Sequence, residues 1–366
     1  MKMQKSWRLL LSFLISIFLL GCHSTTTLEN LPSSASKRIP FGAIYQDRQY
    51  MSHPIQAVKA INYHTQVKNQ ADFITQVNYI RQSGVTFLPQ FDSTYNKITR
   101  WITSGENIEK LTHYGIKLEQ LAGVDGYQNV LMTGYYSPVI NVSHKKQGKY
   151  RYPIYALPKK KYRYSRTKIY AGALRGKKLE IAYSDSLLDN FLLGVQGSGY
   201  LNFGKGKLTY IGYAGKNDYP YTSIGRILVE QNKIEADQVS IPTIRQWAAK
   251  HPAQLRKLLE HNQSFVFFKP SPNKNITGAA GVALVPLAAV ASDRQLIPSG
   301  SVLLVEVPEL TSEGKWSGKH HLHLMIALDI GGAIKGQHLD LYQGKGKQAE
   351  HTAGYLRHYG RVWILK

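Results

Sequence analysis

The spacing of apolar positions predicts helices in two parts of the chain. Between Ala71 and Gly84, apolar side chains recur three or four positions apart, as on one face of a helix, and the glycine is a typical stop. A second helical stretch begins at Ser223. It is followed by residues 242–250 and 252–261, which predict two more helices because each has a proline in its first turn, where the missing N–H is not needed.

From about residue 130 the pattern changes to short apolar and β-branched runs separated by glycine, proline and basic turns. Such runs predict the strands of a small barrel or sandwich. The breaker-rich segment 269–275 is the best domain boundary. Together these patterns predict a mostly β protein with a few helices and two β domains. We expect strands at 130–136, 149–155, 179–183, 207–213 and 264–269 before the boundary, and at 282–287, 301–307, 321–329, 337–342 and 361–365 after it.

The N-terminus has the pattern of a secretory signal. A basic start, residues 2–8, precedes an apolar run, residues 9–20, that is too short to span a bilayer with ease. The motif that follows, Leu-Leu-Gly with Cys22, resembles the bacterial lipobox, in which the cysteine is lipidated and becomes the mature N-terminus. An ordinary signal peptide with an incidental cysteine is the alternative.

The position after the cysteine bears on where the protein resides. His23, in place of an aspartate, resembles the sorting pattern of outer-membrane lipoproteins. We therefore expect residues 1–21 to be a signal peptide and residues 22–40, which are rich in Ser and Thr, to be a lipidated tether. The expected location is the outer membrane of a Gram-negative bacterium, facing the periplasm. Cell-wall synthesis or division proteins are candidate partners there.

Composition narrows the function classes. The 366 residues carry 46 Lys and Arg against 23 Asp and Glu, a formal net charge of +23, so the chain is attracted to polyanions such as nucleic acid, an anionic membrane or an acidic polymer. A hydrophobic share of 43% excludes global disorder. The single cysteine excludes a disulfide framework and a cysteine-based zinc site. Because acids are scarce, each acid in an apolar or glycine-rich setting is a candidate for chemistry.

Three aspartates in the C-terminal third have such settings. Asp329 ends an apolar run and precedes two glycines, and Asp293 lies among small and polar residues. Asp340 lies in a strand whose alternation places His338 and Tyr342 on the same face. A carboxyl group in such surroundings can have a raised pKa and donate a proton. From spacing alone, each of these acids is more often a turn residue that bonds its own backbone.

The three aspartates together resemble the 3D domain, a double-psi β-barrel that is named for them. The resemblance rests on Ala-Leu-Asp-Ile-Gly-Gly at 327–332, Leu-Asp-Leu-Tyr-Gln-Gly at 339–344 and Gly-Arg-Val-Trp at 360–363. Upstream, Met-Thr-Gly-Tyr-Tyr-Ser-Pro at 132–138 and Val-Gln-Gly-Ser-Gly at 195–199 are similar to the companion domain of one family. The chain is therefore identified as a member of the membrane-bound lytic murein transglycosylase A family.

The resemblance implies a fold and its domain limits. Residues 41–136 and the 3D part, residues 272–366, would together form the double-psi β-barrel domain. Residues 137–271 would form a smaller β-barrel domain inserted between these two parts. A groove between the two domains would hold the substrate.

The resemblance also implies an activity. The family cleaves the β-1,4 bond between N-acetylmuramic acid and N-acetylglucosamine in peptidoglycan without water and leaves a 1,6-anhydro end. Catalysis is assigned to the aspartate of the Asp-Leu/Ile-Tyr-Gln-Gly segment, here Asp340, which acts first as acid and then as base. One carboxyl group suffices because the substrate's own C6 hydroxyl attacks C1, whereas an ordinary glycosidase uses two. No cofactor or metal is implied, and exolytic or endolytic action stays open.

Other residues receive supporting roles from the same resemblance. Asp329 is expected to bond Asp340 or sugar hydroxyls, or else to stabilise the barrel, and Asp293 to be structural. Lys335 is expected to pair with an acid or to meet substrate carboxylates, unless it is a solvated turn lysine. Small or polar side chains suited to bond a sugar at close range are predicted to bind substrate, namely those of Thr133, Gly134, Tyr135, Gln196, Gly197, Ser198 and Gly199.

Weaker patterns point to other functions. His320, His321 and His323 lie close in sequence, but no cysteine or carboxylate motif accompanies them, so a metal site is not expected. The basic run 159–164 interleaves tyrosines as nucleic-acid binders do, yet a secreted lipoprotein meets peptidoglycan instead, whose peptides carry free carboxylates. Three hypotheses remain: a lytic transglycosylase, a hydrolytic muramidase on the same groove, and a non-enzymatic lipoprotein that only binds the cell wall.

Overall fold

The computed structural model describes residues 54–366, except residues 64, 161, 205, 207 and 272–274. The expected signal peptide, the tether and Cys22 therefore lie outside the described residues. Among the described residues, no helix has both the length and the apolar character needed to cross a bilayer. Two sheets and a smaller number of helices make up the fold, which confirms the expected mostly β class.

The larger sheet has the strand order β1-β2-β15-β11-β12-β10-β13-β3-β14. It combines strands from both ends of the described chain, so the residues between them form an insertion. The second half of β12 is buried on both faces, which explains why it contains a continuous apolar run rather than an alternating one. The strands are β1 Ile55–Val58, β2 Leu118–Leu121, β3 Val130–Ser137, β10 Ala289–Ala291, β11 Val302–Leu310, β12 Trp316–Asp329, β13 His338–Lys345, β14 Arg357–Gly360 and β15 Val362–Leu365.

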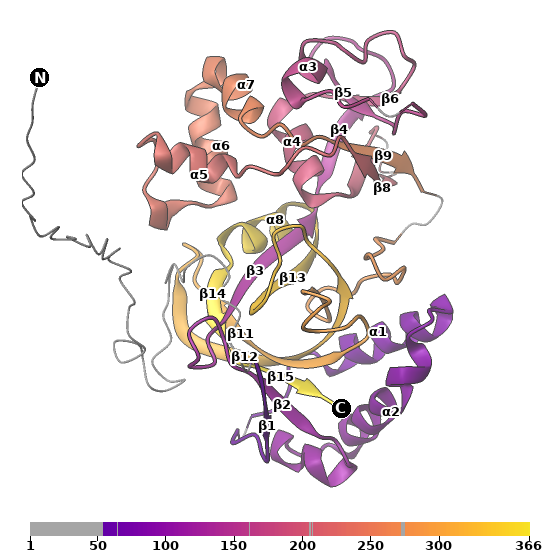
Figure 1. The fold of residues 1–366 in the computed structure, drawn as a ribbon, viewed down its shortest axis with the longest axis vertical. Coiled ribbons are helices and arrows are strands. Elements are labelled where there is room, and N and C mark those ends of the chain that lie inside the picture. The colour runs from indigo at the N-terminus through magenta and orange to yellow at the C-terminus, as the bar shows by residue number, and fades with distance from the viewer. Residues whose placement is uncertain (1–53, 64, 161, 205, 207, 272–274) are drawn as a thin grey trace, which may run out of the picture.

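Helices α1 (Gln70–Ser83) and α2 (Leu88–Ser104), followed by the short helix η3 (Ile108–Tyr114), cover one face of this sheet. Figure 1 shows α1 and α2 beside the large sheet, away from the small one. α1 confirms the predicted helix, and it ends at Gly84, which adopts a left-handed conformation with φ of 66°. α2 was not predicted.

The smaller sheet lies within the insertion and has the strand order β5-β6-β4-β7-β8-β9. Its helices lie on the same side of the molecule, opposite the large sheet (Figure 1). Helix α4 begins at Ser186, whose hydroxyl accepts a hydrogen bond from the backbone of Asp189. The elements are β4 Val139–Ser143, β5 Tyr152–Tyr155, α3 Arg166–Tyr170, β6 Glu180–Ser184, α4 Leu187–Gln196, β7 Gly199–Asn202, β8 Leu208–Lys216, α5 Ile224–Glu230, η4 Ala236–Gln238, α6 Ile241–Lys250, α7 Pro252–Glu260 and β9 Val266–Pro270.

The predicted strand at residues 282–287 is wrong. The segment is irregular because Pro286 has no N–H to donate and Leu287 adopts a positive φ of 54°. The strand that forms instead is β10, which begins two residues later. The predicted helices after Ser223, at 242–250 and at 252–261 are confirmed as α5, α6 and α7.

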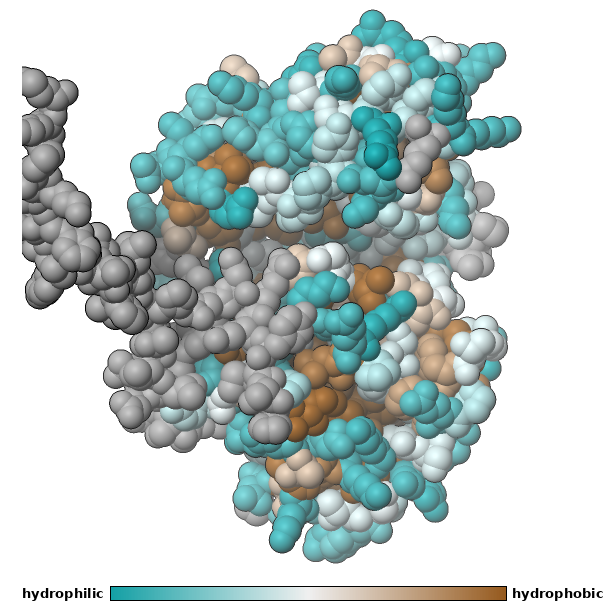
Figure 2. All heavy atoms as spheres, viewed as in Figure 1, coloured by the Kyte–Doolittle hydropathy of each residue, from teal (hydrophilic) through white to brown (hydrophobic). Residues whose placement is uncertain are grey.

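Helix α8 (Gly346–Tyr355) joins the two halves of the molecule. It packs on β3 and β13 of the large sheet and on α6 of the insertion. Arg245 of α6 lies between two acids, with Nη2 2.6 Å from Asp189 Oδ1 in α4 and Nε 2.5 Å from Glu350 Oε1 in α8. This charged contact fixes the insertion against the large sheet. Figure 2 shows the surface hollowed between the two halves, with apolar side chains exposed along the hollow.

Candidate active site

A cavity of about 520 Å³ opens between the two sheets. The large sheet supplies the middle of β3, the ends of β10 and β12 and the first half of β13, and the loop after β12 forms one rim. The insertion supplies the C-terminal end of α4 and the start of β9. The cavity is therefore a groove between the two halves, as expected from the sequence.

Strand pairing brings the two acids of the groove to one place. In the parallel pair of β13 and β3, Asp340 lies opposite Thr133. On the other side of β13, Asp340 lies opposite Ala291 of β10, and Ala291 in turn lies opposite Asp329 of β12. The backbones of the two acids are thus two strands apart, about 10 Å. The small methyl group of Ala291 lies between them and leaves the space above it open.

The Asp340 carboxyl group lies deep in the groove, and the residue is still partly accessible from it. The Thr133 hydroxyl donates a hydrogen bond to Asp340 Oδ1 over 2.7 Å. The pKa of Asp340 is raised to about 7, chiefly by burial; the bond from Thr133 lowers it and the negative charge of Asp329 adds to the rise. Asp340 can therefore hold a proton near neutral pH, and Oδ1 is occupied, so Oδ2 is the oxygen that faces a reactant.

His338 completes a short chain of hydrogen bonds. Its Nε2 lies 2.8 Å from the Thr133 hydroxyl oxygen. A hydroxyl group has one hydrogen, and here it points at Asp340, so the imidazole Nε2–H must donate to Thr133. His338 and Asp340 are two positions apart on β13 and share a strand face, as the alternation predicted. His338 thereby fixes the direction of the Thr133 hydroxyl.

Asp329 has a different environment. Its Oδ1 accepts hydrogen bonds of 2.9 Å from the backbone N–H groups of Ala279 and Ile330, and its Oδ2 accepts one of 3.0 Å from the Tyr135 hydroxyl. Burial raises the pKa of Asp329, and these three donors oppose that rise. Within the described residues, no hydrogen bond joins Asp329 to Asp340. Asp329 acts on Asp340 through its charge.

The remaining predicted residues divide into two groups. Thr133, Gly134, Tyr135 and Gln196 line the groove, whereas Gly197, Ser198, Gly199 and Lys335 are not among its lining residues. Gly199 is buried, and a side-chain carbon there would approach the Pro138 carbonyl oxygen to 2.8 Å. Gly197 ends α4 in a left-handed conformation, and Lys335 is exposed. The glycines of this motif therefore serve packing and helix termination.

At two positions of the groove, the packing of the fold also explains which residue is present. At Gly134 a side-chain carbon would lie 2.8 Å from the Cα atom of Ala353 in α8, so only glycine allows this close contact. The Gln196 side chain accepts a hydrogen bond of 3.0 Å from the backbone N–H of Tyr136 and so ties α4 to β3. This hydrogen bond therefore fixes the position of Gln196 at the groove.

Asp293 is a structural residue in this arrangement, as expected. It is 2% exposed, and its two oxygens accept bonds from the backbone N–H groups of Gln295 and Gly336, at 3.1 and 2.9 Å. These bonds hold the end of the loop before β13 against the turn that follows β10. In the part of the chain that the structure describes, no three His, Cys, Asp or Glu side chains gather as metal ligands.

Sequence reasoning missed several residues of the groove. Val195, Tyr221 and Ile330 line it, and they are three of the six large hydrophobic residues described as exposed. Exposed apolar groups along a polar cavity suit the faces of a sugar chain. The position of Ile330 beside Asp329 was a usable signal, and so was the place of Tyr221 in a tyrosine-rich stretch, because tyrosine rings stack on sugar faces.

Comparisons with known proteins agree with this arrangement. Residues 131–269 match the MltA specific insert domain, and residues 288–366 match the 3D domain. The chain is 45% identical over 344 residues to the membrane-bound lytic murein transglycosylase A of Escherichia coli K12, covering 93% of this chain and 94% of that protein. The chain belongs to the membrane-bound lytic murein transglycosylase A family.

Two further members of the family illustrate its range. The Vibrio cholerae protein of the same name is 43% identical over 301 residues, which are 81% of this chain and 82% of that one. A crystal structure of E. coli MltA with bound chitohexaose matches with a TM-score of 0.84 at 45% identity, covering 89% of this chain and 98% of that one. The matched MltA insert domain covers nearly the same residues as the smaller sheet and its helices.

Replacing Thr133 tests the hydrogen bond that this site depends on. Thr133→Val removes a donor that favours the ionised carboxylate, so the pKa of Asp340 should rise above about 7. Thr133→Ser keeps the hydroxyl and should leave the pKa near its parent value. Titration of the carboxyl carbon by NMR measures both. An unchanged or lower pKa in Thr133→Val would contradict the assigned bond.

The buried acid should also affect stability. The folded-state pKa of Asp340 lies above its ordinary value of 3.8, so the folded state binds the proton more tightly and loses stability as pH rises through about 7. Asp340→Asn carries no charge at any pH. The melting temperature of Asp340→Asn relative to the parent should therefore increase from about pH 4 to about pH 8. Asp72→Asn, which changes an exposed acid, is the control; a constant difference for Asp340→Asn would contradict the raised pKa.

Proposed function

We propose that the chain is a lytic transglycosylase that cleaves the β-1,4 bond between N-acetylmuramic acid and N-acetylglucosamine in peptidoglycan and leaves a 1,6-anhydro end. Membership of the lytic murein transglycosylase A family supports the reaction class. The observation that carries the proposal for this chain is the carboxyl group of Asp340, which has a pKa of about 7 and lies in an open groove.

In the first step Asp340 is the general acid. Its Oδ2 gives a proton to the glycosidic oxygen as the bond from that oxygen to C1 breaks. A pKa of about 7 suits this role, because the group is protonated often enough and still gives up its proton readily. The Thr133 bond keeps Oδ1 out of the reaction and fixes the carboxyl plane.

In the second step the same carboxylate is the general base. The C6 hydroxyl of the muramic sugar attacks C1, the new bond from O6 to C1 closes the anhydro ring, and Asp340 takes the C6 hydroxyl proton. The proton lost in the first step is thus regained, and no water enters the product. The substrate brings its own nucleophile at high effective concentration, so no second catalytic carboxylate is required.

Asp329 has an electrostatic role in this proposal. Its charge raises the pKa of Asp340 and favours positive charge that develops at C1 in the transition state. The Tyr135 hydroxyl, whose own pKa is raised well above its ordinary value by burial and by Asp329, stays protonated and keeps donating to Asp329. Tyr135 therefore helps to hold Asp329 in place and ionised.

A hydrolytic muramidase on the same groove is the main alternative. Hydrolysis needs a second carboxylate that is free to activate a water molecule or to attack C1. The two oxygens of Asp329 are already engaged by Ala279, Ile330 and Tyr135. This arrangement favours the mechanism in which only Asp340 exchanges protons. A protein that only binds cell wall would have no need of a carboxyl group with so raised a pKa.

The same proposal includes the location. Cys22 and the lipobox motif support lipidation, and the relatives are membrane-bound proteins by name. Acyl chains on Cys22 would anchor the chain in the outer membrane, each buried CH₂ contributing about 0.8 kcal/mol. Residues 22–40 would then let the groove reach peptidoglycan in the periplasm. The net charge of +23 suits a mesh whose peptides carry free carboxylates.

Products of sacculus digestion test the reaction. Purified sacculi incubated with the protein should release anhydro-muropeptides, identified by mass spectrometry. Asp340→Asn should lower the rate by about 100-fold or more, because the acid and the base are both lost. Asp329→Asn should reduce the rate less, because it removes a charge and no proton carrier.

The control for folding is Asp72→Asn, which changes an exposed acid of α1 and should retain the parent rate. Parent activity in Asp340→Asn, or products that are one water heavier, would overturn the mechanism. Equal losses in Asp340→Asn and Asp329→Asn would contradict the division of roles between the two acids.

The lipid anchor has its own test. In cells supplied with labelled palmitate, the parent chain should incorporate the label and fractionate with the outer membrane. Cys22→Ser should incorporate none and appear in the periplasmic fraction, whereas the nearby Thr27→Ala should behave as the parent. Label retained in Cys22→Ser would contradict lipidation at this residue.

A further inference from the structure

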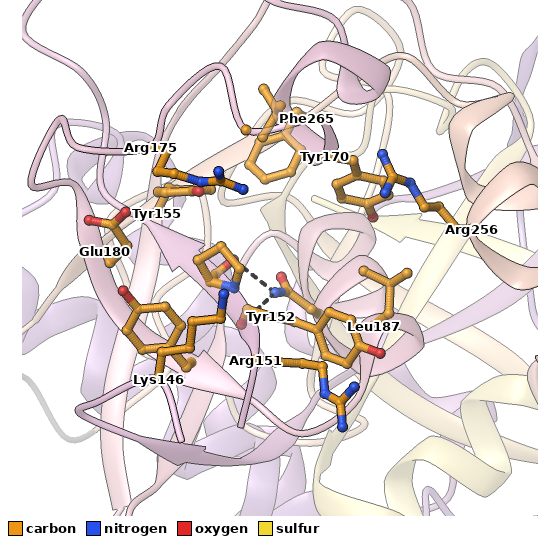
Figure 3. Close-up of a pocket in the computed structure, with 15 residues that line it drawn as sticks. Lys146, Arg151, Tyr152, Tyr155, Tyr170, Arg175, Glu180, Leu187, Arg256 and Phe265 are labelled. Carbon is orange, nitrogen blue, oxygen red and sulfur yellow. Dashed lines mark hydrogen bonds between the residues drawn. The ribbon is translucent and has the colours of Figure 1, made fainter. Parts of the chain in front are cut away.

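A second cavity, of about 400 Å³, lies within the insertion (Figure 3). Its volume is in the usual range for small-ligand sites. It is separated from the groove by β9 and α4. Phe265 lines this cavity, whereas its neighbours Ser264 and Val266 line the groove. Likewise the start of α4, with Leu187, lines this cavity, and the end of α4 lines the groove.

Positive charge dominates the cavity. Lys146, Arg151, Arg175 and Arg256 line it, against one acid, Glu180. Arg256 is paired with Glu260 over 2.9 Å, but among the described residues Lys146, Arg151 and Arg175 form no ion pair. Figure 3 shows the cationic groups of Lys146 and Arg175 directed towards the middle of the cavity, and Arg151 at its edge. Three cations that form no ion pair in the described part of the chain, against one acid, favour an anion.

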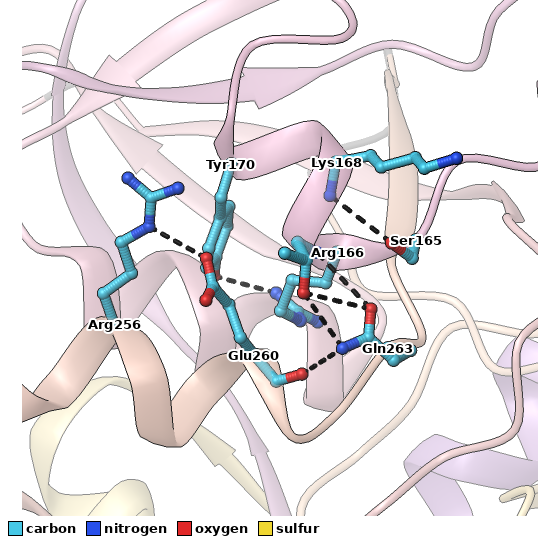
Figure 4. Close-up of polar contacts among 8 residues, drawn as sticks. Ser165, Arg166, Lys168, Tyr170, Arg256, Glu260 and Gln263 are labelled. Carbon is cyan, nitrogen blue, oxygen red and sulfur yellow. Dashed lines mark hydrogen bonds and ion pairs between the residues drawn. The ribbon is translucent and has the colours of Figure 1, made fainter.

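The walls of the cavity are apolar and firmly held. Buried Phe265 and Tyr155 and half-buried Tyr170 form part of them. Arg166, which is 4% exposed, donates to the Tyr170 hydroxyl over 2.9 Å and to the Asn262 carbonyl over 2.7 Å. Its guanidinium also lies 5.1 Å from the Phe265 ring centre. Figure 4 shows the bond between Arg166 and Tyr170, and it shows Gln263 bonded both to α3 and to Glu260 at the end of α7. The cavity is therefore preformed, which lowers the entropy lost on binding.

One neutral polar group is available beside the cations. Asn190 lines the cavity, and its Nδ2 donates to the carbonyl oxygens of Tyr152 and Pro153, at 3.3 and 2.9 Å. These bonds fix the orientation of the amide, so its Oδ1 can accept a hydrogen bond from an N–H group. The cavity thus offers cations for a carboxylate, an acceptor for an amide N–H, and apolar walls for small side chains.

We infer that this cavity binds a short peptide through its free C-terminal carboxylate, held between Lys146 and Arg175. Peptidoglycan supplies such peptides, so the choice of ligand rests on the proposed function. Glu180 disfavours a multiply charged phosphate group, because it places an acid in the same wall. Leu187 and Gln196 are nine residues apart on α4, which is about 14 Å of helix. An extended peptide of four or five residues spans about 13–18 Å, so the peptide can belong to the strand in the groove or to a neighbouring strand. In either case the site would hold the groove against peptide-bearing mesh.

Calorimetry with the full-length lipoprotein in detergent tests the site. The probes are N-acetyl-D-alanyl-D-alanine and the same dipeptide with a C-terminal amide. The carboxylate should bind at least about tenfold more tightly than the amide, and Lys146→Gln with Arg175→Gln should remove that difference. The charge-matched control, Lys233→Gln with Lys257→Gln, changes two exposed lysines of the insertion outside the cavity and should bind as the parent does.

Equal binding of the two probes by the parent, or parent affinity in the Lys146 and Arg175 double variant, would overturn the inference. Equal competition by inorganic phosphate or by single-stranded oligonucleotide would also overturn it, because the site would then be a general anion site.

A second experiment compares cleavage of intact sacculi with cleavage of glycan strands stripped of peptides. The double variant should be slower than the parent on sacculi only.

These experiments distinguish failure of the proposed transglycosylase activity from failure of the proposed peptide site. Absence of cleavage by the parent on both substrates would overturn the proposed function. Peptide binding by that same parent, lost in the double variant, would still support the cavity as a peptide site. Equal rates of parent and double variant on sacculi would overturn the role of the cavity in holding the mesh.

Discussion

Thr133 and Asp340 are 207 residues apart in sequence, and the parallel pairing of β3 with β13 places them directly opposite each other. The rest of the site depends on this pairing. Parallel neighbours need a long connection between them, and here that connection includes the whole insertion. β3 runs into the insertion through Pro138, and the chain returns at β10, which pairs with the other side of β13. The same strand arrangement that aligns the acids therefore also carries the second wall of the groove.

The two carboxyl groups differ because their hydrogen-bond donors differ. Asp329 is bonded by two backbone N–H groups and a tyrosine hydroxyl, which stabilise its charge against burial. Asp340 has one hydroxyl donor, and burial with the nearby charge of Asp329 raises its pKa to about 7. Pairs of acids whose environments separate their pKa values are typical of acid and base catalysis. In the proposed mechanism only Asp340 exchanges protons, and a reaction whose nucleophile comes from the substrate needs only one such group.

Much of this could be predicted from local sequence, and the rest depended on distant contacts. The face shared by His338 and Asp340 follows from strand alternation, and α1 follows from helical spacing and Gly84. The bond between Thr133 and Asp340 does not, because no local pattern sets the register of strands so far apart. Helix α4 was not predicted, although its buried residues Leu188, Phe191 and Leu192 recur at helical spacing. The sugar-binding role of Gly199 stays a prediction, whereas the close approach of Pro138, which also requires glycine there, is seen only in the folded chain.

A lytic transglycosylase and a hydrolytic muramidase differ in whether a water molecule enters the product. In this account Asp340 exchanges a proton with the leaving oxygen and with the C6 hydroxyl, and no water molecule reaches C1. Digestion of sacculi in water labelled with heavy oxygen, followed by mass spectrometry of the new chain ends, measures this directly. We predict anhydro-muramic ends that contain no label. Labelled reducing ends formed at the rate of bond cleavage would contradict the account.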